Sequence, residues 1–368
     1  MRAVTRGSAL GLMAWVLMAG TAAAQAPAVQ ISGSVDAYYT YNFNTPKVEC
    51  GAAQGVAIYN CFRTSDVTHN AFSLSLAELS VAKKSTADSR AAFRVDLGFG
   101  PTATILNEFE PGGAEVYHNV AQAYVGYLAP IGNGLQVDFG KFYTPVGFES
   151  VNSQNNWNYS RSLNFALAVP RYHAGLRATY AVNDKVSVMG MLTNGWNNVV
   201  EDNGAKTLGG QITIKPNAAF MISTAYIGGP EQENNNADWR HLWDSVASYE
   251  INTKVSVAAN YDYGQETQGT KTVKWQGIAG YLKFQPTEWF ALTPRVEYYN
   301  DKHGATTGEI QNVKEATLTL EFKPKGGVLT RVEYRGDSSN HPYFYKNTLE
   351  VSGQRTLTVG VVYAFSSK

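Results

Sequence analysis

Cysteine, net charge and long apolar runs are all scarce in this chain of 368 residues. Its two cysteines are too few to hold together a small disulfide-rich domain. Lys and Arg (30) balance Asp and Glu (30), so the chain lacks the basic excess typical of nucleic-acid-binding proteins. Only one apolar run approaches the length of a membrane-spanning helix and the mean hydropathy is −0.24, which excludes a helical membrane protein.

Motifs that carry catalysis or metal binding are missing as well. The sequence contains no H-E-x-x-H, G-x-S-x-G, P-loop or C-x-x-C pattern, and its six histidines are scattered without ligand spacing. Residues 98–103 match G-x-G-x-x-A, but the segment before them alternates in polarity and no βαβ unit surrounds them. We therefore expect no catalytic residues, no metal, no cofactor and no enzyme activity.

The one long apolar run lies at the N-terminus. Arg2 and Arg6 precede the apolar residues 8–21, and Ala22, Ala23 and Ala24 form a small-residue cleavage site. This order is typical of a secretory signal peptide, residues 1–24, which leaves residues 25–368 as the mature chain and a single domain. The alternative is an uncleaved membrane-anchor helix.

Aromatic residues are plentiful, at 12%, and many lie in segments where apolar and polar residues alternate. In residues 91–99, for example, Phe93, Val95 and Leu97 share one face. Strict alternation indicates strands with one apolar and one polar face. We expect about sixteen such strands, at 30–41, 70–82, 90–99, 118–128, 135–143, 172–180, 185–193, 207–215, 218–227, 240–251, 254–263, 274–284, 289–299, 313–323, 328–335 and 349–365.

The connections between these segments alternate between short and long. Short ones carry the Gly, Pro, Asn and Asp of tight turns, as at 129–134, 181–184, 215–217, 285–288 and 323–327. Long ones lie at 42–69, 100–117, 144–171, 194–206, 228–239, 264–273, 300–312 and 336–348. Short turns on one side and long loops on the other predict an all-β fold, a transmembrane antiparallel β-barrel of about 16 strands, with 14–18 possible.

Two segments break the alternation. The apolar phase changes within residues 72–81, which predicts a β-bulge. Pro294 interrupts a strand that has no free edge in a closed barrel, and a local bulge is the only explanation that the sequence offers.

Charged residues of the strands fall on the polar face. A charge on the lipid face would cost about 2–4 kcal/mol near the membrane midplane, so we expect these side chains to point into the lumen. There they could act on charged solutes, or they could form salt bridges that only hold the wall. The expected pore-lining residues are Asp36, Arg94, Asp96, Asp138, Arg177, Arg295, Glu297, Glu315, Glu321, Arg331, Glu333 and Arg335.

Cys50 and Cys61 lie together in the first long loop. In an exported protein a disulfide between them is the expectation. The alternatives are two free thiols or two ligands of a metal site.

Six stretches carry a resemblance to a known family: 31–44, 69–84, 93–103, 110–117, 134–147 and 156–163. Together they resemble the OmpL-like β-barrel porin family (putative beta-barrel porin-2), most closely before about Trp196. The resemblance implies a Gram-negative outer-membrane barrel with a pore, and it supplies no catalytic residues.

The last strand is similar to the terminal signal of outer-membrane barrels, polar-x-Gly-x-x-aromatic-x-aromatic. Thr358, Gly360, Tyr363 and Phe365 fill its places, although three residues follow Phe365. The similarity implies that the barrel assembly machinery and periplasmic chaperones act during biogenesis, and that outer-membrane lipid and lipopolysaccharide surround the barrel.

The longest loop, 144–171, is the third on its side. In general porins of sixteen strands, to which the predicted fold is similar, a loop at this position folds inward and narrows the pore. Glu149, Arg161 and Arg171 would then be constriction residues, and the apolar stretch 165–169 would pack on the interior. The alternative is a loop that stays on the surface.

The leading functional hypothesis is an outer-membrane porin, monomeric or homo-oligomeric. It would allow passive diffusion of small hydrophilic solutes through a charged, water-filled lumen. The alternatives are a surface receptor or adhesin that acts through the long loops, and a barrel hydrolase, for which no nucleophile–base pair is evident.

Overall fold

The structure is a computed structural model that describes residues 29–108, 110, 116–324 and 326–367. The predicted signal peptide and its cleavage site after Ala24 lie outside the described residues.

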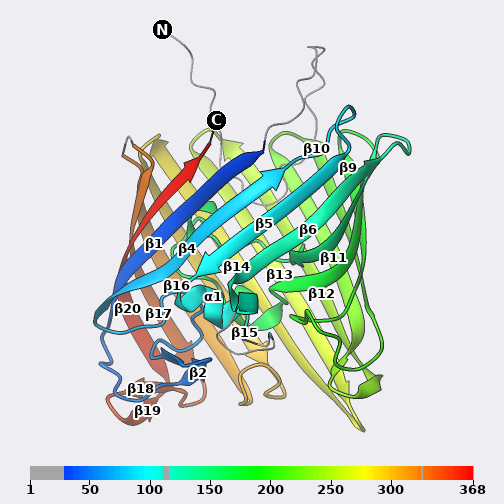
Figure 1. Cartoon of the computed structure of the whole chain (residues 1–368). Coiled ribbons are helices and arrows are strands. Elements are labelled where there is room, and N and C mark those ends of the chain that lie inside the picture. The colour runs from blue at the N-terminus through cyan, green and yellow to red at the C-terminus, as the bar shows by residue number, and fades with distance from the viewer. Residues whose placement is uncertain (1–28, 109, 111–115, 325, 368) are drawn as a thin grey trace.

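Sixteen antiparallel strands close into one barrel (Figure 1). Each pairs with its neighbours along the chain, and the ring closes between the first strand and the last. The barrel strands are β1 (Gln30–Asn42), β4 (Ala71–Lys83), β5 (Ala91–Phe99), β6 (Val120–Ala129), β7 (Leu135–Tyr143), β8 (Tyr172–Ala181), β9 (Val186–Thr193), β10 (Thr207–Asn217), β11 (Phe220–Gln232), β12 (Asn235–Asn252), β13 (Val255–Gln268), β14 (Lys271–Thr287), β15 (Phe290–Asp301), β16 (Gln311–Phe322), β17 (Val328–Ser339) and β20 (Gly353–Ser366).

The sequence-based fold class is confirmed, because each predicted segment corresponds to one barrel strand. The alternation of apolar and polar residues arises because the two faces of each strand point in opposite directions. In β20, Leu357, Val359 and Val361 face outward and are 40%, 39% and 42% exposed, whereas Thr356 and Thr358 face inward and are 1% exposed. An apolar exterior and a polar interior are the reverse of a soluble protein, and they suit a wall with lipid outside.

Short elements lie within the long loops. They are β2 (Gly51–Ala53), β3 (Val56–Ile58), α1 (Pro101–Leu106), η1 (Val116–Asn119), η2 (Ser153–Asn155), η3 (Asn164–Ala168), β18 (Phe344–Lys346) and β19 (Leu349–Val351). Figure 1 shows β2, β18 and β19 at the end opposite the start of β1. Within the part of the chain that the structure describes, no helix is long and apolar enough to cross a membrane.

Two connections expected to be long loops are hairpins instead. β11 and β12 continue through 228–239 and turn at 233–234, and β13 and β14 continue through 264–273 and turn at 269–270. Outside the bilayer both faces of a strand can meet water, so the period-2 signal disappears while the backbone ladder continues. The last barrel strand likewise begins at Gly353 rather than at 349, because the residues before it form β19.

The two breaks in the alternation have different outcomes. The bulge within 72–81 is confirmed: Asp36 pairs with Leu76 and Ala37 with Leu74, which leaves Ser75 as the extra residue. The prediction of a bulge at Pro294 is wrong.

β15 pairs with β16 in unbroken register through Pro294 and Leu318. Toward β14 the pairs Tyr281–Arg295 and Phe284–Leu292 also keep one register. Proline lacks an N–H donor, so the ladder loses hydrogen bonds locally without an inserted residue.

A disulfide joins Cys50 and Cys61, whose Cα atoms lie 5.6 Å apart. It closes the loop that carries the β2–β3 hairpin. Next to it, Phe62 stacks on Tyr343 with 4.6 Å between ring centroids, so the first outer loop docks on the last.

We expect thiol alkylation of the folded, unreduced protein to label neither cysteine. Replacing both by serine should cost on the order of 2–3 kcal/mol of loop stability in the chain-entropy account. The barrel itself should persist, because its wall is held by inter-strand hydrogen bonds. Gel mobility of heated and unheated samples reports the barrel. Full labelling without reductant would contradict the bridge.

Candidate functional site: a loop held across the lumen

Residues 144–171, between β7 and β8, form the third outer loop, called L3 below. On one side of the barrel, Gln211 Nε2 of β10 donates to the carbonyl of Pro145 (2.6 Å). On another side, Asn152 Nδ2 of L3 donates to Glu78 Oε1 of β4 (2.8 Å). The loop therefore folds inward and crosses the lumen, which favours the inward of the two sequence-based alternatives.

Three wall arginines hold the L3 backbone, and we call Arg295, Arg331 and Arg335 the arginine clamp. They stand on β15 and β17 and are 1%, 1% and 0% exposed. Arg331 Nη1 donates to the carbonyls of Ser153 (2.6 Å) and Asn158 (3.1 Å). A planar guanidinium with five N–H donors and no acceptor suits a row of carbonyl oxygens.

The other two arginines continue the row. Arg295 Nη1 donates to the carbonyl of Ser160 (2.8 Å), and Arg335 Nη1 donates to that of Arg161 (2.6 Å). Arg295 Nη1 also lies 2.8 Å from Glu149 Oε1, so one predicted constriction residue pairs with the clamp.

Wall carboxylates satisfy the N–H groups of the same stretch. Glu333 accepts from the backbone N–H of Tyr159 (2.7 Å) and Ser160 (3.0 Å). Glu297 Oε2 accepts from the N–H of Leu163 (2.7 Å). Donors and acceptors of the loop thus find partners on β15 and β17, as buried backbone groups require.

Each arginine of the clamp also forms an ion pair with a carboxylate of the wall. Arg331 pairs with Glu321 (2.6 Å), Arg335 with Asp337 (2.8 Å) and Arg295 with Glu315 (3.1 Å). A buried charge is tolerated when it is paired and hydrogen-bonded, and each of the three guanidiniums has a carboxylate partner and donates to L3 carbonyls.

The predicted constriction residues Arg161 and Arg171 have different surroundings. Arg161 donates to the carbonyls of Ser150 (2.9 Å) and Tyr159 (2.5 Å), so it braces L3 from within. Burial lowers the pKa of its guanidinium, and the nearby carboxylates Asp36 and Glu149 offset part of that effect.

Arg171 lies elsewhere, with Glu108 Oε1 3.2 Å away and the carbonyl of Ile105 at 3.3 Å. It ties the end of L3 to the loop after β5. The structure therefore brings Glu149 and Arg161 together at the clamp and leaves Arg171 out of it.

The glycine of the predicted assembly signal has a role that the sequence did not reveal. Gly360 faces the lumen, and a Cβ at this position would overlap the ring of Tyr159. Tyr159 Oη in turn donates to Asp36 Oδ1 (2.8 Å). The glycine therefore gives L3 room to lie against β20 and β1.

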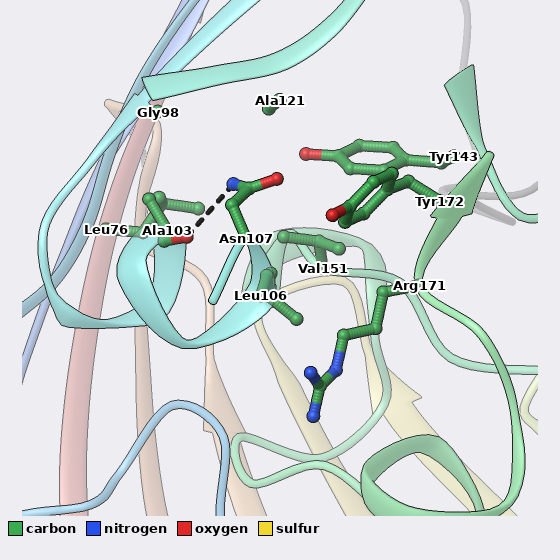
Figure 2. Close-up of a pocket in the computed structure, with 10 residues that line it drawn as sticks. All are labelled: Leu76, Gly98, Ala103, Leu106, Asn107, Ala121, Tyr143, Val151, Arg171 and Tyr172. Carbon is green, nitrogen blue, oxygen red and sulfur yellow. Dashed lines mark hydrogen bonds between the residues drawn. The ribbon is translucent and has the colours of Figure 1, made fainter. Parts of the chain in front are cut away.

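Next to L3, α1 packs against β4 and β5. Figure 2 shows Leu76, Ala103 and Leu106 facing Val151 of L3 around a small hollow. Its volume is about 10 Å³, which leaves space for about one water molecule. This contact is packing and offers no room for a solute.

The remaining predicted pore-lining charges are the ones that reach water. The side chains of Arg94 on β5 and Arg177 on β8 are 31% and 15% exposed, although they pair with Asp96 and Asp138, each at 2.8 Å. β8 lies eight strands from β16 in either direction around the ring, so Arg177 stands across the lumen from the clamp.

The predicted set of twelve charges thus divides in two. The side chains of Arg94, Arg177 and Asp138 are 31%, 15% and 8% exposed, and their pore-lining role stays a prediction. The other nine side chains are buried. Asp96 is held by Arg94 and Gln122, and the remaining eight bind L3 or pair with residues that do: Asp36, Arg295, Glu297, Glu315, Glu321, Arg331, Glu333 and Arg335.

Comparisons with known proteins agree with this architecture. The profile of one family, described as "Putative beta-barrel porin-2, OmpL-like", matches residues 28–365. No curated protein matches the chain in sequence.

Solved structures share the fold at low identity. An anion-selective porin from Comamonas acidovorans is 11% identical, with a TM-score of 0.63 over 92% of this chain and 99% of that one. Salmonella typhi OmpF in complex with daunomycin is 13% identical, with a TM-score of 0.61 over 92% and 98%. OmpT of Vibrio cholerae in a trimer form is 11% identical, with a TM-score of 0.59 over 93% and 100%.

Replacing Arg331 by alanine tests the clamp. The change leaves Glu321 and several L3 carbonyls without a buried donor, and we expect a loss of about 3–5 kcal/mol. L3 should become cleavable by added protease while the barrel stays closed. Thermal unfolding in detergent and limited proteolysis measure the two effects.

Arg355→Ala is the matched control, since Arg355 lies on β20 and is exposed. The clamp would be refuted if Arg331→Ala and Arg355→Ala behaved alike in both measurements.

Proposed function

The chain belongs to the OmpL-like putative beta-barrel porin-2 family, and from that premise we propose that it is a passive outer-membrane pore for small hydrophilic solutes. Family membership favours a non-enzymatic role over a barrel hydrolase. A receptor or adhesin role has no specific support among the described residues and becomes an outcome of the test below.

The observation that carries the proposal is the unequal exposure of the lumen charges. L3 fills the side of the lumen next to β15–β17, where the clamp arginines are at most 1% exposed. Arg177, across the ring from β16, keeps 15% of its side-chain surface exposed, and Arg94 on β5 keeps 31%. We infer that the path for solutes passes Arg94 and Arg177.

The same pairs support a preference for anions. In each, the cation is more exposed than its carboxylate: 31% against 0% for Arg94 and Asp96, and 15% against 8% for Arg177 and Asp138. Lys283 and Glu321 repeat the pattern at 15% against 2%. A solute in the lumen would therefore meet the guanidinium and ammonium groups of these pairs before their carboxylates.

Biogenesis and assembly complete the proposal. Residues 1–24 would be removed on export, and the last strand, with Thr358, Gly360, Tyr363 and Phe365, would be read by the barrel assembly machinery with help from periplasmic chaperones. Lipopolysaccharide and phospholipid would then surround the exposed apolar belt. A homo-oligomer is compatible with the trimer form of the OmpT structure to which this fold is similar.

Planar-bilayer recordings of the refolded protein test the pore. We expect a steady conductance and a reversal potential that indicates anion preference in a salt gradient. Replacing Arg94 and Arg177 together by glutamine should lower the anion-to-cation permeability ratio roughly fivefold, since one charge acts on an ion 4 Å away with about 1 kcal/mol in water.

Arg355→Gln, on the outer face, is the control and should leave the ratio unchanged. A folded wild-type protein without conductance would count against the pore and reopen the receptor role. An unchanged ratio in the double variant would show that the path does not pass β5 and β8.

A further inference from the structure

Two buried carboxylates face each other on the inner wall, away from the arginine clamp. Asp244 of β12 and Asp262 of β13 are directly opposite in register and are 1% and 0% exposed. Among the described residues, no Lys, Arg or His forms an ion pair with either carboxylate. Like charges placed directly opposite on neighbouring strands destabilise a sheet, and burial increases the cost.

Most of the carboxylate oxygens also lack a hydrogen-bond donor. Asp244 Oδ2 accepts from the N–H of Gly147 (3.2 Å) and from Asn260 Nδ2 (2.8 Å). Asp244 Oδ1 and both oxygens of Asp262 have no partner in the described structure. Buried polar atoms are rarely left in this state, so three such atoms at one point call for an explanation.

L3 brings a fourth oxygen of the same kind. Asn164 is 1% exposed, and its Nδ2 donates to the carbonyl of Asn260 (3.3 Å), but its Oδ1 has no donor. Gly277 of β14 is the register partner of Asp262, and a Cβ on Gly277 would overlap Asn164 Oδ1.

Because Asn164 Oδ1 occupies the place of a Cβ on Gly277, its position relative to Asp262 can be estimated. Opposite Cβ positions on paired strands are about 5 Å apart, so Asn164 Oδ1 lies about 5 Å from the Cβ of Asp262, on the same face. The Asp262 carboxylate can close most of that gap. Four unpaired oxygens from Asp244, Asp262 and Asn164 therefore gather in one buried place.

We propose that Asp244, Asp262 and Asn164 bind a calcium ion inside the barrel. The donor set consists of carboxylate and amide oxygens, carries two negative charges and contains no nitrogen or sulfur ligand, as hard cations prefer. Calcium accepts irregular arrangements of such oxygens at 2.3–2.6 Å, whereas magnesium demands near-ideal octahedral geometry.

The site is distinct from ordinary acidic clusters. No group of three or more His, Cys, Asp or Glu side chains within the described ranges is placed to hold a metal ion. Here an asparagine of L3 supplies the third side chain, so the three ligands show no metal-ligand spacing along the chain.

A cation at this point ties L3 to a second part of the wall. Asn164 belongs to η3 of L3, while its partners stand on β12 and β13, and the clamp residues stand on β15 and β17. The backbone N–H of Phe148 also donates to Asn260 Oδ1 (3.3 Å) next to the site. Calcium would thus fix η3 of L3 against β12 and β13, which the clamp arginines do not reach.

The competing explanation is a proton shared by the two carboxylates. It would relieve the repulsion, but one proton held between the two carboxylates cannot also be donated to Asn164 Oδ1. It also predicts that stability depends on pH and not on calcium, so the two explanations separate experimentally.

Thermal unfolding of the EDTA-treated, refolded mature protein makes the first test. Adding millimolar CaCl2 should raise the wild-type midpoint by roughly 5 °C. Asp262→Asn should show no rise, and without calcium it should be at least as stable as wild type because the repulsion is gone. Asp138→Asn, which alters a lumen carboxylate outside the site, should keep the full response.

Terbium luminescence makes the second test. A Cβ on Gly277 would also touch the ring of Tyr299, so this tyrosine is close enough to sensitise Tb³⁺ bound at the site. Added CaCl2 should quench the signal in wild type, and Asn164→Ala and Asp244→Asn should lose it even if Asp262→Asn fails to fold.

Calcium that shifts neither the midpoint nor the terbium signal of wild type would overturn the proposal in favour of the shared proton. Equal responses of Asp262→Asn and Asp138→Asn would also overturn it, because the ion would then bind elsewhere. Neither readout involves conductance, so the result is independent of the pore proposal.

Discussion

The structure depends on one constraint: a loop that enters a barrel must find partners for its backbone. L3 carries N–H and C=O groups away from bulk water, and each group left unpaired would cost about 1–3 kcal/mol. Arg295, Arg331 and Arg335 supply donors to its carbonyls, and Glu297 and Glu333 accept from its N–H groups. The side chains of the inner wall thus provide the backbone of L3 with hydrogen-bond partners, as a neighbouring strand does within a sheet.

This constraint makes the lumen asymmetric. The wall of β15–β17 carries many charges, but nearly all are used by the loop or by one another. The wall of β5–β8 carries fewer, and Arg94 and Arg177 keep contact with water. The number of charges on a strand is therefore a poor guide to what a solute would meet, and the exposure of each charge is a better one.

Sequence reasoning was accurate where one physical rule acts along the whole strand. Outward Leu357, Val359 and Val361 alternate with inward threonines because lipid and lumen lie on opposite faces. The rule failed where that contrast ends, as in the β11–β12 and β13–β14 hairpins beyond the membrane. The alternation also predicts that Arg331 points inward. It cannot predict which groups an inward side chain contacts.

The candidate site could be predicted only in part for the same reason. The inward path of L3 was expected from the fold, and Glu149 and Arg161 do lie at the clamp. From the sequence, the inward charges could act on solutes or form salt bridges within the wall. The structure shows a third use, because several of them bind the backbone of a loop. Gly360 and Gly277 make room for Tyr159 and Asn164, and such contacts between distant segments become visible only in three dimensions.

Hydrogen exchange of the wild-type protein in detergent micelles tests the central claim most directly. The amide protons of Tyr159, Ser160 and Leu163 are bound by buried wall carboxylates, so they should exchange as slowly as those of the central residues of β16. Exchange as fast as that of the exposed residues Lys302 and His303 would show that L3 is not held across the lumen, and the clamp would be contradicted.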